Sequence, residues 1–104
     1  MRHLDDTTFD AAIADPDRPV LVDFSAAWCG PCKQQRPVLE RFAREHPEVD
    51  VCEVDVDRAP AVAQRFGIQA MPTLLLFSGG EVRAQVRGLS SARRLERLLE
   101  EARS

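Results

Sequence analysis

Two cysteines in the run Trp28-Cys29-Gly30-Pro31-Cys32-Lys33 are the residues of this sequence best suited to chemistry. Residues three apart on a helix share one face, so Cys29 and Cys32 can approach to the separation that a disulfide needs, roughly 5.5 Å between Cα atoms. Such a pair can open and close as a disulfide without unfolding the chain around it. The spacing therefore predicts a redox-active dithiol.

The flanking residues place this pair at the start of a helix. The apolar segment 20–24 is expected to form a buried strand, and residues 33–46 are expected to form an amphipathic helix whose first turn holds the thiols. Backbone N–H groups at a helix N-terminus stabilise an anion, which favours the thiolate form of Cys29. We also expect Cys29 to be exposed at the helix start and Cys32 to lie one turn deeper.

The same spacing of cysteines is found in half of a zinc site. A structural zinc ion needs two further ligands. The sequence offers only Cys52, His3 and His46 for that purpose, and none of them belongs to a second paired motif. We therefore expect no metal at the thiols.

Asp23 is an acidic residue inside the apolar segment 20–24. An unpaired carboxylate is costly to bury, so a buried Asp23 is expected to stay protonated, with a pKa above the ordinary value of an aspartate. The alternative is an aspartate at the end of a strand whose side chain points into solvent.

The composition limits the classes of function. The 104 residues suit a single domain, 1–104, and the acidic and basic residues are interspersed, with a formal net charge of -3. No basic block indicates nucleic-acid binding, and no apolar run is long enough to span a membrane. The N-terminal residues lack the apolar region of a signal peptide, so a cytoplasmic location is expected. In that compartment a Cys-X-X-Cys is more often catalytic or metal-binding than a permanent disulfide.

The remaining elements follow from hydrophobic periodicity and from helix signals. Asp6 or Thr7 is expected to cap a first helix that stops before Pro16. Further strands are expected at 49–56, 73–77 and 82–87, and further helices at 60–66 and after a cap at Ser90 or Ser91. This order predicts an α/β fold with a central mixed β-sheet flanked by helices on both faces.

The sequence resembles the thioredoxin family over nearly its whole length. The residues that carry the resemblance are Val22-Asp23-Phe24, Trp28-Cys29-Gly30-Pro31-Cys32-Lys33, Pro37, Met71-Pro72-Thr73, Gly79-Gly80 and Gly88. A Cys-X-X-Cys alone is weak evidence, but one that follows a buried aspartate and precedes an X-Pro-Thr strand start by about forty residues is specific. The resemblance implies the thioredoxin fold and a thiol:disulfide oxidoreductase that reduces protein disulfides. It implies no cofactor, because the redox pair is part of the chain.

The resemblance assigns a role to each residue of the motif. Cys29 attacks the substrate disulfide, Cys32 resolves the mixed disulfide, and Asp23, beneath Cys32, transfers the proton. Gly30 and Pro31 tune the redox potential, and in this family the Gly-Pro pair accompanies reducing members.

Further residues are implied to bind the substrate. Met71-Pro72 matches the family's cis-proline, and the Met71 backbone would pair with an extended substrate segment. Trp28 and Gly88 would complete the shallow apolar surface around the thiols, although Trp28 could instead be an ordinary core residue. Lys33 would either favour the thiolate or lie solvated on the helix.

The partners implied by the resemblance are disulfide-containing client proteins and a flavoprotein thioredoxin reductase, with the chain as a monomer. Two alternative functions stay open. The first is a specialised thioredoxin-like reductant for one client or pathway. The second is a binding or chaperone-like module without redox turnover, and the intact Cys29 and Cys32 argue against it.

Two positions depart from the pattern of the family. Ser25 stands where many bacterial members of the family have tryptophan, and Glu53 stands where many have a lysine near the buried aspartate. If Glu53 approaches Asp23, its charge disfavours ionisation of Asp23; otherwise Glu53 points into solvent and is screened. Cys52 lies in a strand and is expected to be an inert buried thiol.

Overall fold

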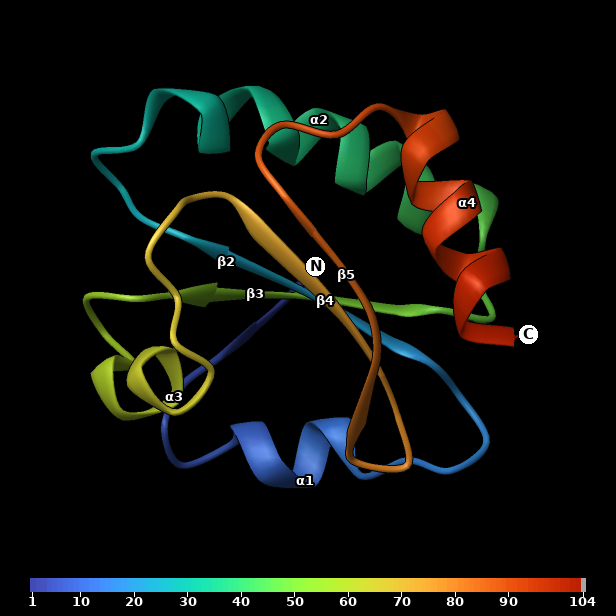
Figure 1. Ribbon diagram of the computed structural model, residues 1–104, viewed down its shortest axis with the longest axis horizontal. Coiled ribbons are helices and arrows are strands. Elements are labelled where there is room, and N and C mark those ends of the chain that lie inside the picture. The colour runs from blue at the N-terminus through green and yellow to red at the C-terminus, as the bar shows by residue number, and fades with distance from the viewer. Residues whose placement is uncertain (104) are drawn as a thin grey trace.

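A five-stranded mixed β-sheet forms the centre of the protein in a computed structural model, which describes residues 1–103 (Figure 1). The elements, in chain order, are β1 (Arg2–Leu4), α1 (Phe9–Ile13), β2 (Val20–Ser25), α2 (Gly30–Glu45), β3 (Asp50–Asp55), α3 (Pro60–Arg65), β4 (Thr73–Ser78), β5 (Glu81–Arg87) and α4 (Ala92–Arg103). The strands lie in the order β1-β3-β2-β4-β5. Strands β1, β3 and β2 are parallel, β4 is antiparallel to β2, and β5 is antiparallel to β4. The predicted α/β fold with a mixed sheet is confirmed.

The sheet buries an apolar layer on each face, because successive side chains of a strand point to opposite sides. Val20, Val22 and Phe24 of β2 pack in the cluster that includes residues of α1 and α3. Leu21 packs in the other cluster, with residues of α2 and α4. Figure 1 shows α2 and α4 on one side of the sheet and α1 and α3 on the other. Asp23 is two residues after Leu21 in β2, so the two side chains point to the same face of the sheet, which α2 covers.

Helix α2 confirms the prediction of a long helix whose first turn contains the thiols. Cys29 is the N-cap residue, with extended backbone angles, and Pro31 lies in the first turn, where a missing N–H costs no hydrogen bond. Leu39 and Phe42 form its buried side. The helix ends at Glu45, just before His46-Pro47, as expected from the restriction that proline places on the preceding residue.

The N-terminal strand β1 was not predicted. It has only three residues, which is too short for a period of two to be recognised, and only Leu4 among them is buried. It exists because it pairs in parallel with β3, with Leu4 opposite Val54. A pairing with residues fifty positions away leaves no local signal in the sequence.

The predicted cap of the first helix is wrong. Helix α1 begins at Phe9, and the N-cap residue is Thr8, not Asp6 or Thr7. The Asp6 carboxylate instead accepts hydrogen bonds from the backbone N–H groups of Ala61 (3.4 Å) and Val62 (3.0 Å) at the start of α3. Asp6 therefore satisfies N–H groups of a helix that is distant in sequence but close in space.

The other predicted elements are confirmed to within one or two residues at their ends. Ser91 Oγ accepts a hydrogen bond from the backbone N–H of Arg94 at 3.2 Å, consistent with a cap for α4.

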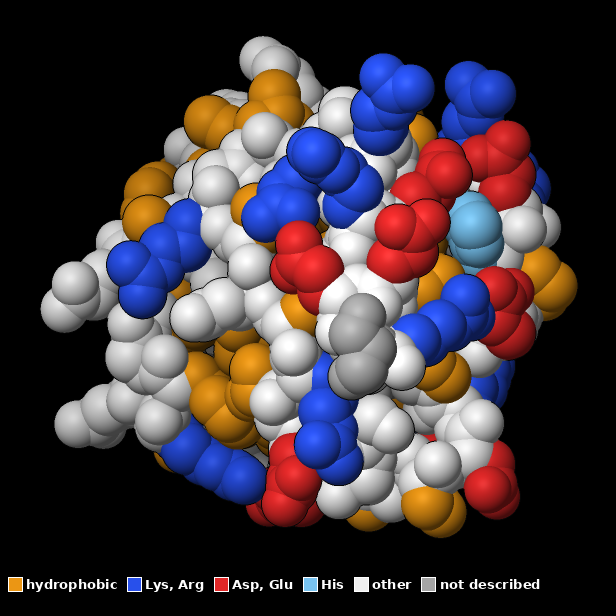
Figure 2. Space-filling view, turned by 45° about the vertical axis from the view of Figure 1, so that its right-hand side comes forward, with side chains coloured by type: hydrophobic (Ala, Val, Ile, Leu, Met, Phe, Trp, Pro, Cys, Tyr) orange, Lys and Arg blue, Asp and Glu red, His pale blue; other side chains and the backbone are white. Residues whose placement is uncertain are grey.

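Figure 2 shows basic and acidic side chains interspersed on the face that it views. Charged side chains of opposite sign form ion pairs, such as Arg94–Glu101 and Arg103–Glu48. Within residues 1–103, no helix has the length and apolar character needed to cross a membrane.

Candidate active site

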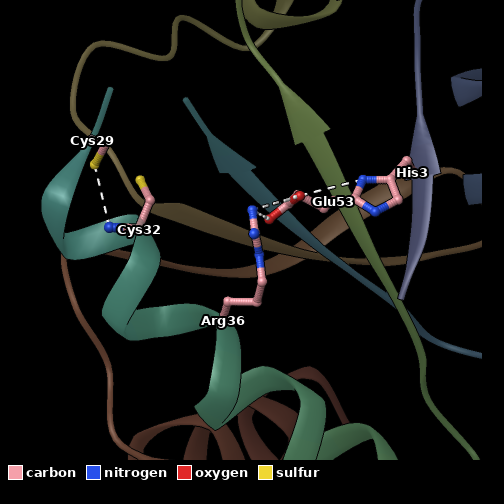
Figure 3. A network of polar contacts seen from close by, with 5 residues as sticks. All are labelled: His3, Cys29, Cys32, Arg36 and Glu53. Atoms are coloured by element: carbon pink, nitrogen blue, oxygen red, sulfur yellow. Dashed lines mark hydrogen bonds and ion pairs between the residues drawn. The ribbon is translucent and has the colours of Figure 1, made fainter. Parts of the chain in front are cut away.

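The two motif cysteines lie together at the start of α2, with both thiols free (Figure 3). Cys32 is 2% exposed, one turn into the helix. Cys29 is only 6% exposed, so the expectation of an exposed thiol is wrong. The reason is packing: Ala26 and the two cysteines form a small apolar cluster, and Met71 packs against it from the loop before β4.

The two thiols have different surroundings. The backbone N–H of Cys32 donates to Cys29 Sγ at 3.3 Å, and the Cys29 thiol donates to the Met71 carbonyl oxygen at 3.6 Å. The first of these bonds places the Cys29 sulfur at the N-terminus of α2, where backbone N–H groups point toward it. Burial, followed by the contact with Cys29, raises the pKa of Cys32 to about 12. The Cys32 thiol is therefore protonated near neutral pH.

Asp23 lies in the interior of the protein, and the alternative of a solvent-facing aspartate does not apply. It is 0% exposed, and neither carboxyl oxygen has a hydrogen-bond partner among the described residues. Burial, with the nearby charge of Glu53, raises the pKa of Asp23 to about 7, and the Arg36 cation lowers it in part. The charge of Asp23 in turn contributes to the raised pKa of Cys32, so the two groups are electrostatic neighbours.

Glu53 is the partner of Asp23 in the pairing of β2 with β3. Its carboxylate belongs to a polar network with Arg36 and His3 (Figure 3). Its carboxylate is 3.1 Å and 3.2 Å from Nη2 of Arg36 on α2, and 3.3 Å from Nδ1 of His3 on β1. Glu53 is 4% exposed, so it is buried and paired rather than solvated. Sequence reasoning singled out Glu53 but missed Arg36, whose signal is its position four residues after Cys32 on the same side of the helix.

The residues implied to bind substrate lie around the thiols in different ways. Trp28 is 68% exposed, and its indole N–H donates to Asp57 Oδ2 at 2.9 Å, so Trp28 is not a core residue. The Met71-Pro72 peptide bond is cis. Gly88 has φ of 87°, which favours glycine, and its N–H donates to the Pro72 carbonyl at 2.8 Å.

Among the tuning residues, Gly30, Pro31 and Lys33 are all exposed on the first turn of α2. Gly30 and Pro31 occupy the backbone between the two thiols, where proline supplies no N–H.

Gln35 is a buried polar residue that sequence reasoning missed. It is 0% exposed on α2, and its side-chain amide binds the backbone of Ser90. The signal was available, because residue 35 falls on the same helical face as the buried Leu39 and Phe42. A glutamine at such a position needs a partner in the core.

Cys52 is separate from the motif. It is 0% exposed on β3, and burial, with the neighbouring Asp50, raises its pKa to about 11. Within residues 1–103, no group of three or more His, Cys, Asp or Glu side chains is arranged to hold a metal ion.

Comparison with known proteins identifies close relatives. The model of the thioredoxin family matches residues 1–101. Thioredoxin of Alicyclobacillus acidocaldarius subsp. acidocaldarius is 48% identical over 94 residues, 89% of each chain. Thioredoxin-1 of Saccharomyces cerevisiae (strain ATCC 204508 / S288c) is 49% identical over 84 residues, 81% of each chain. The bifunctional thioredoxin reductase/thioredoxin of Mycobacterium leprae (strain TN) is 46% identical over 77 residues, which are 73% of this chain and 17% of that protein.

Proposed function

The chain belongs to the thioredoxin family and is a thiol-disulfide oxidoreductase, and from this premise we propose that it reduces protein disulfides with Cys29 as nucleophile and Cys32 as resolving thiol. The observation that carries the assignment is the difference between the two thiols. Cys29 Sγ accepts the N–H of Cys32 at the helix start, whereas Cys32 lies deeper, with its pKa raised to about 12.

The reaction proceeds in two thiol-disulfide exchanges. The Cys29 thiolate attacks one sulfur of the substrate disulfide, a Cys29–substrate disulfide forms, and the other substrate sulfur leaves as a thiolate. Cys32 then gives up its proton and attacks Cys29 Sγ, which releases the second substrate sulfur. Two electrons have passed to the substrate, and the chain is left with a Cys29–Cys32 disulfide.

Asp23 is proposed as the group that takes the proton of Cys32. Among the described residues neither of its oxygens has a hydrogen-bond partner, and its pKa of about 7 gives it protonated and ionised forms in comparable amounts near neutral pH. A base is most effective when its pKa lies near the working pH. No cofactor is needed for these steps, because both electrons come from the two thiols.

The substrate is proposed to lie over the small apolar cluster at the thiols. Trp28 is the exposed aromatic residue of the motif, Met71 packs against the cluster next to Cys29, and the N–H of Gly88 donates to the carbonyl of Pro72, which follows Met71. An extended substrate segment would pair with the Met71 backbone. Gly30, Pro31 and Lys33 are proposed to tune the redox potential from the first turn of α2.

We propose that the chain acts as a single domain, 1–104, and as a monomer in the cytoplasm, and that a flavoprotein thioredoxin reductase regenerates the dithiol. The name of the Mycobacterium leprae relative joins a thioredoxin reductase and a thioredoxin in one protein, which supports such a pairing of activities.

The test is to trap the mixed disulfide. The Cys32→Ser variant keeps the nucleophile but lacks the resolving thiol. After incubation with insulin whose disulfides are intact, it should therefore carry an insulin chain on Cys29, detected by mass spectrometry. Cys29→Ser should trap almost nothing, and Cys52→Ser should turn over insulin like the unmodified protein. Insulin attached mainly through Cys32, or no trapping together with no insulin reduction by the unmodified protein, would contradict the proposal.

A further inference from the structure

An ion pair between Arg36 and Glu53 stands next to the proposed proton acceptor and has no part in the exchanges described above. One guanidinium nitrogen of Arg36 lies 3.1 Å and 3.2 Å from the two carboxylate oxygens of Glu53. Glu53 is 4% exposed, whereas the Arg36 side chain is half exposed. Arg36 lies on α2, the helix that carries Cys29 and Cys32, and Figure 3 shows its side chain pointing toward Glu53 on β3.

Strand register brings Glu53 beside Asp23. The two residues are direct partners in the parallel pairing of β2 with β3, where adjacent strands lie about 4.8 Å apart. Asp23 alternates in step with Leu21, and Glu53 alternates in step with Val51; both of these apolar residues belong to the cluster beneath α2 and α4. The carboxyl groups of Asp23 and Glu53 therefore lie on the same face of the sheet.

Only one of these two buried carboxyl groups has a cation for a partner. Glu53 is bound by Arg36 and lies 3.3 Å from His3 Nδ1, while Asp23 has no hydrogen-bond partner among the described residues. An anion close to a buried carboxyl group opposes its ionisation, and a cation somewhat farther away opposes that effect in part. The arrangement places the carboxylate of an ion pair next to a carboxyl group that has no such partner among the described residues.

We propose that Arg36 and Glu53 are positioning residues for the proton transfer: their ion pair fixes an anion beside Asp23 and so sets the pH range in which Asp23 accepts the proton of Cys32. This inference rests on the proposed function. It assigns to the pair a role beyond holding α2 against the sheet.

Other titratable and charged groups lie near Asp23 and Glu53. Cys32 and Arg36 face Asp23 from α2, and Glu53 faces it from β3. On its far side Glu53 lines a surface pocket of about 370 Å³, whose other lining residues are His3, Leu4, Asp5, Asp55 and Arg58. A pocket of this size has room for water on that side of Glu53.

Two single substitutions test the sign of the effect. In Glu53→Gln the anion is lost, and the NMR titration of the Asp23 carboxyl carbon in the reduced protein should move down by on the order of one pH unit. In Arg36→Gln the anion is left without its cation, and the same titration should move up. Arg41→Gln breaks an exposed pair with Glu45 on the same helix and should leave the Asp23 titration unchanged.

The charge-reversed double variant Arg36→Glu/Glu53→Lys separates a positioning role from a structural one. It rebuilds an ion pair between α2 and β3, so it should unfold at nearly the same denaturant concentration as the unmodified protein. It places a cation beside Asp23, so the titration should move down. Glu53→Lys alone is unsuitable, because residue 53 is buried and a lysine there would face Arg36.

The pH profile of mixed-disulfide resolution provides the functional readout. Its acidic limb should move in the same direction as the Asp23 titration in each variant, and each measurement is repeated with His3→Gln, since an imidazole ordinarily titrates between pH 5 and 8. Titration curves that coincide in all variants, or a double variant that restores the unmodified curve, would overturn the inference. The titrations need no turnover, so this failure is distinguishable from a Cys32→Ser variant that traps no substrate.

Discussion

The side-chain amide of Gln35 binds both backbone polar groups of Ser90. Gln35 Nε2 donates to the Ser90 carbonyl at 3.0 Å, and Gln35 Oε1 accepts from the Ser90 N–H at 2.7 Å. Both residues are buried. The pair joins the helix that carries the thiols to the loop that follows Gly88.

Replacing Gln35 by alanine should lower the free energy of unfolding by about 3 kcal/mol. Two hydrogen bonds are lost, and the buried N–H and carbonyl of Ser90 are left without their partner. Urea denaturation followed by circular dichroism measures the change. Gln34→Ala, on the exposed side of the same helix, is the matched control and should change stability by less than about 0.5 kcal/mol. Equal effects of the two substitutions would show that the Gln35–Ser90 bonds contribute little.

Asp23→Asn should remove a pH dependence from the stability of the fold. Folding raises the pKa of Asp23 from its ordinary 3.8 to about 7, so the protonated carboxyl is favoured in the native state. The resulting stability is complete below about pH 4 and is lost as the pH rises through about 7. At about 1.4 kcal/mol per pH unit, the difference between these two pKa values corresponds to a loss of unfolding free energy on the order of 4 kcal/mol.

The difference in unfolding free energy between Asp23→Asn and the unmodified protein should therefore shift in favour of the variant between pH 4 and pH 8. Urea titrations at several pH values give this difference directly. Asp17→Asn, which alters an exposed aspartate, should follow the unmodified protein across the range. Parallel curves for Asp23→Asn and the unmodified protein would contradict the raised pKa.

Asp57→Ala should weaken substrate binding without unfolding the protein. Asp57 Oδ2 accepts the indole N–H of Trp28 at 2.9 Å, and Trp28 is otherwise an exposed side chain next to the thiols. Without this bond the indole is free to adopt other rotamers, and KM for insulin should rise roughly two- to tenfold. Asp10→Ala breaks a surface ion pair with Arg65 and serves as the control, with KM unchanged. An increase of the same size in both variants would point to the loss of surface charge instead.

Alkylation should distinguish the three cysteines of the reduced protein. At pH 7.5 iodoacetamide should modify Cys29 first, because burial raises the pKa of Cys32 to about 12 and that of Cys52 to about 11. Thiolate is the reacting form. Peptide mass spectrometry at short times gives the order, and full modification in denaturant shows that all three thiols are accessible to the reagent when unfolded. Early modification of Cys52 would contradict its placement in the interior.

The features that the sequence determined by itself are those set by local geometry. Helix periodicity places residues 29 and 32 on one face, and the alternation of β2 gives Asp23 the same direction as Leu21. Proline and the helix N-terminus fix where α2 starts and where it ends. These relationships depend on neighbours within a few residues, so they could be predicted, together with the sheet and the helices on both of its faces.

Only the tertiary structure decided which distant groups meet. The strand β1 forms because β3 is available to pair with it, and Asp6 binds N–H groups of α3 that no local pattern connects to it. Cys29 is covered because the Met71 loop packs on it. Each of these contacts joins segments more than 40 residues apart, for which sequence spacing gives no distance.

The surroundings of Asp23 show the same division. The sequence indicated a buried Asp23 and suggested Glu53 as its neighbour. Which groups surround the two carboxyls depended on strand register and on the path of α2 across the sheet. That geometry buries Glu53, supplies Arg36 and His3 as its partners, and leaves Asp23 with none among the described residues. Burial and the spacing of charges determine the pKa of Asp23, and both exist only once the chain has folded.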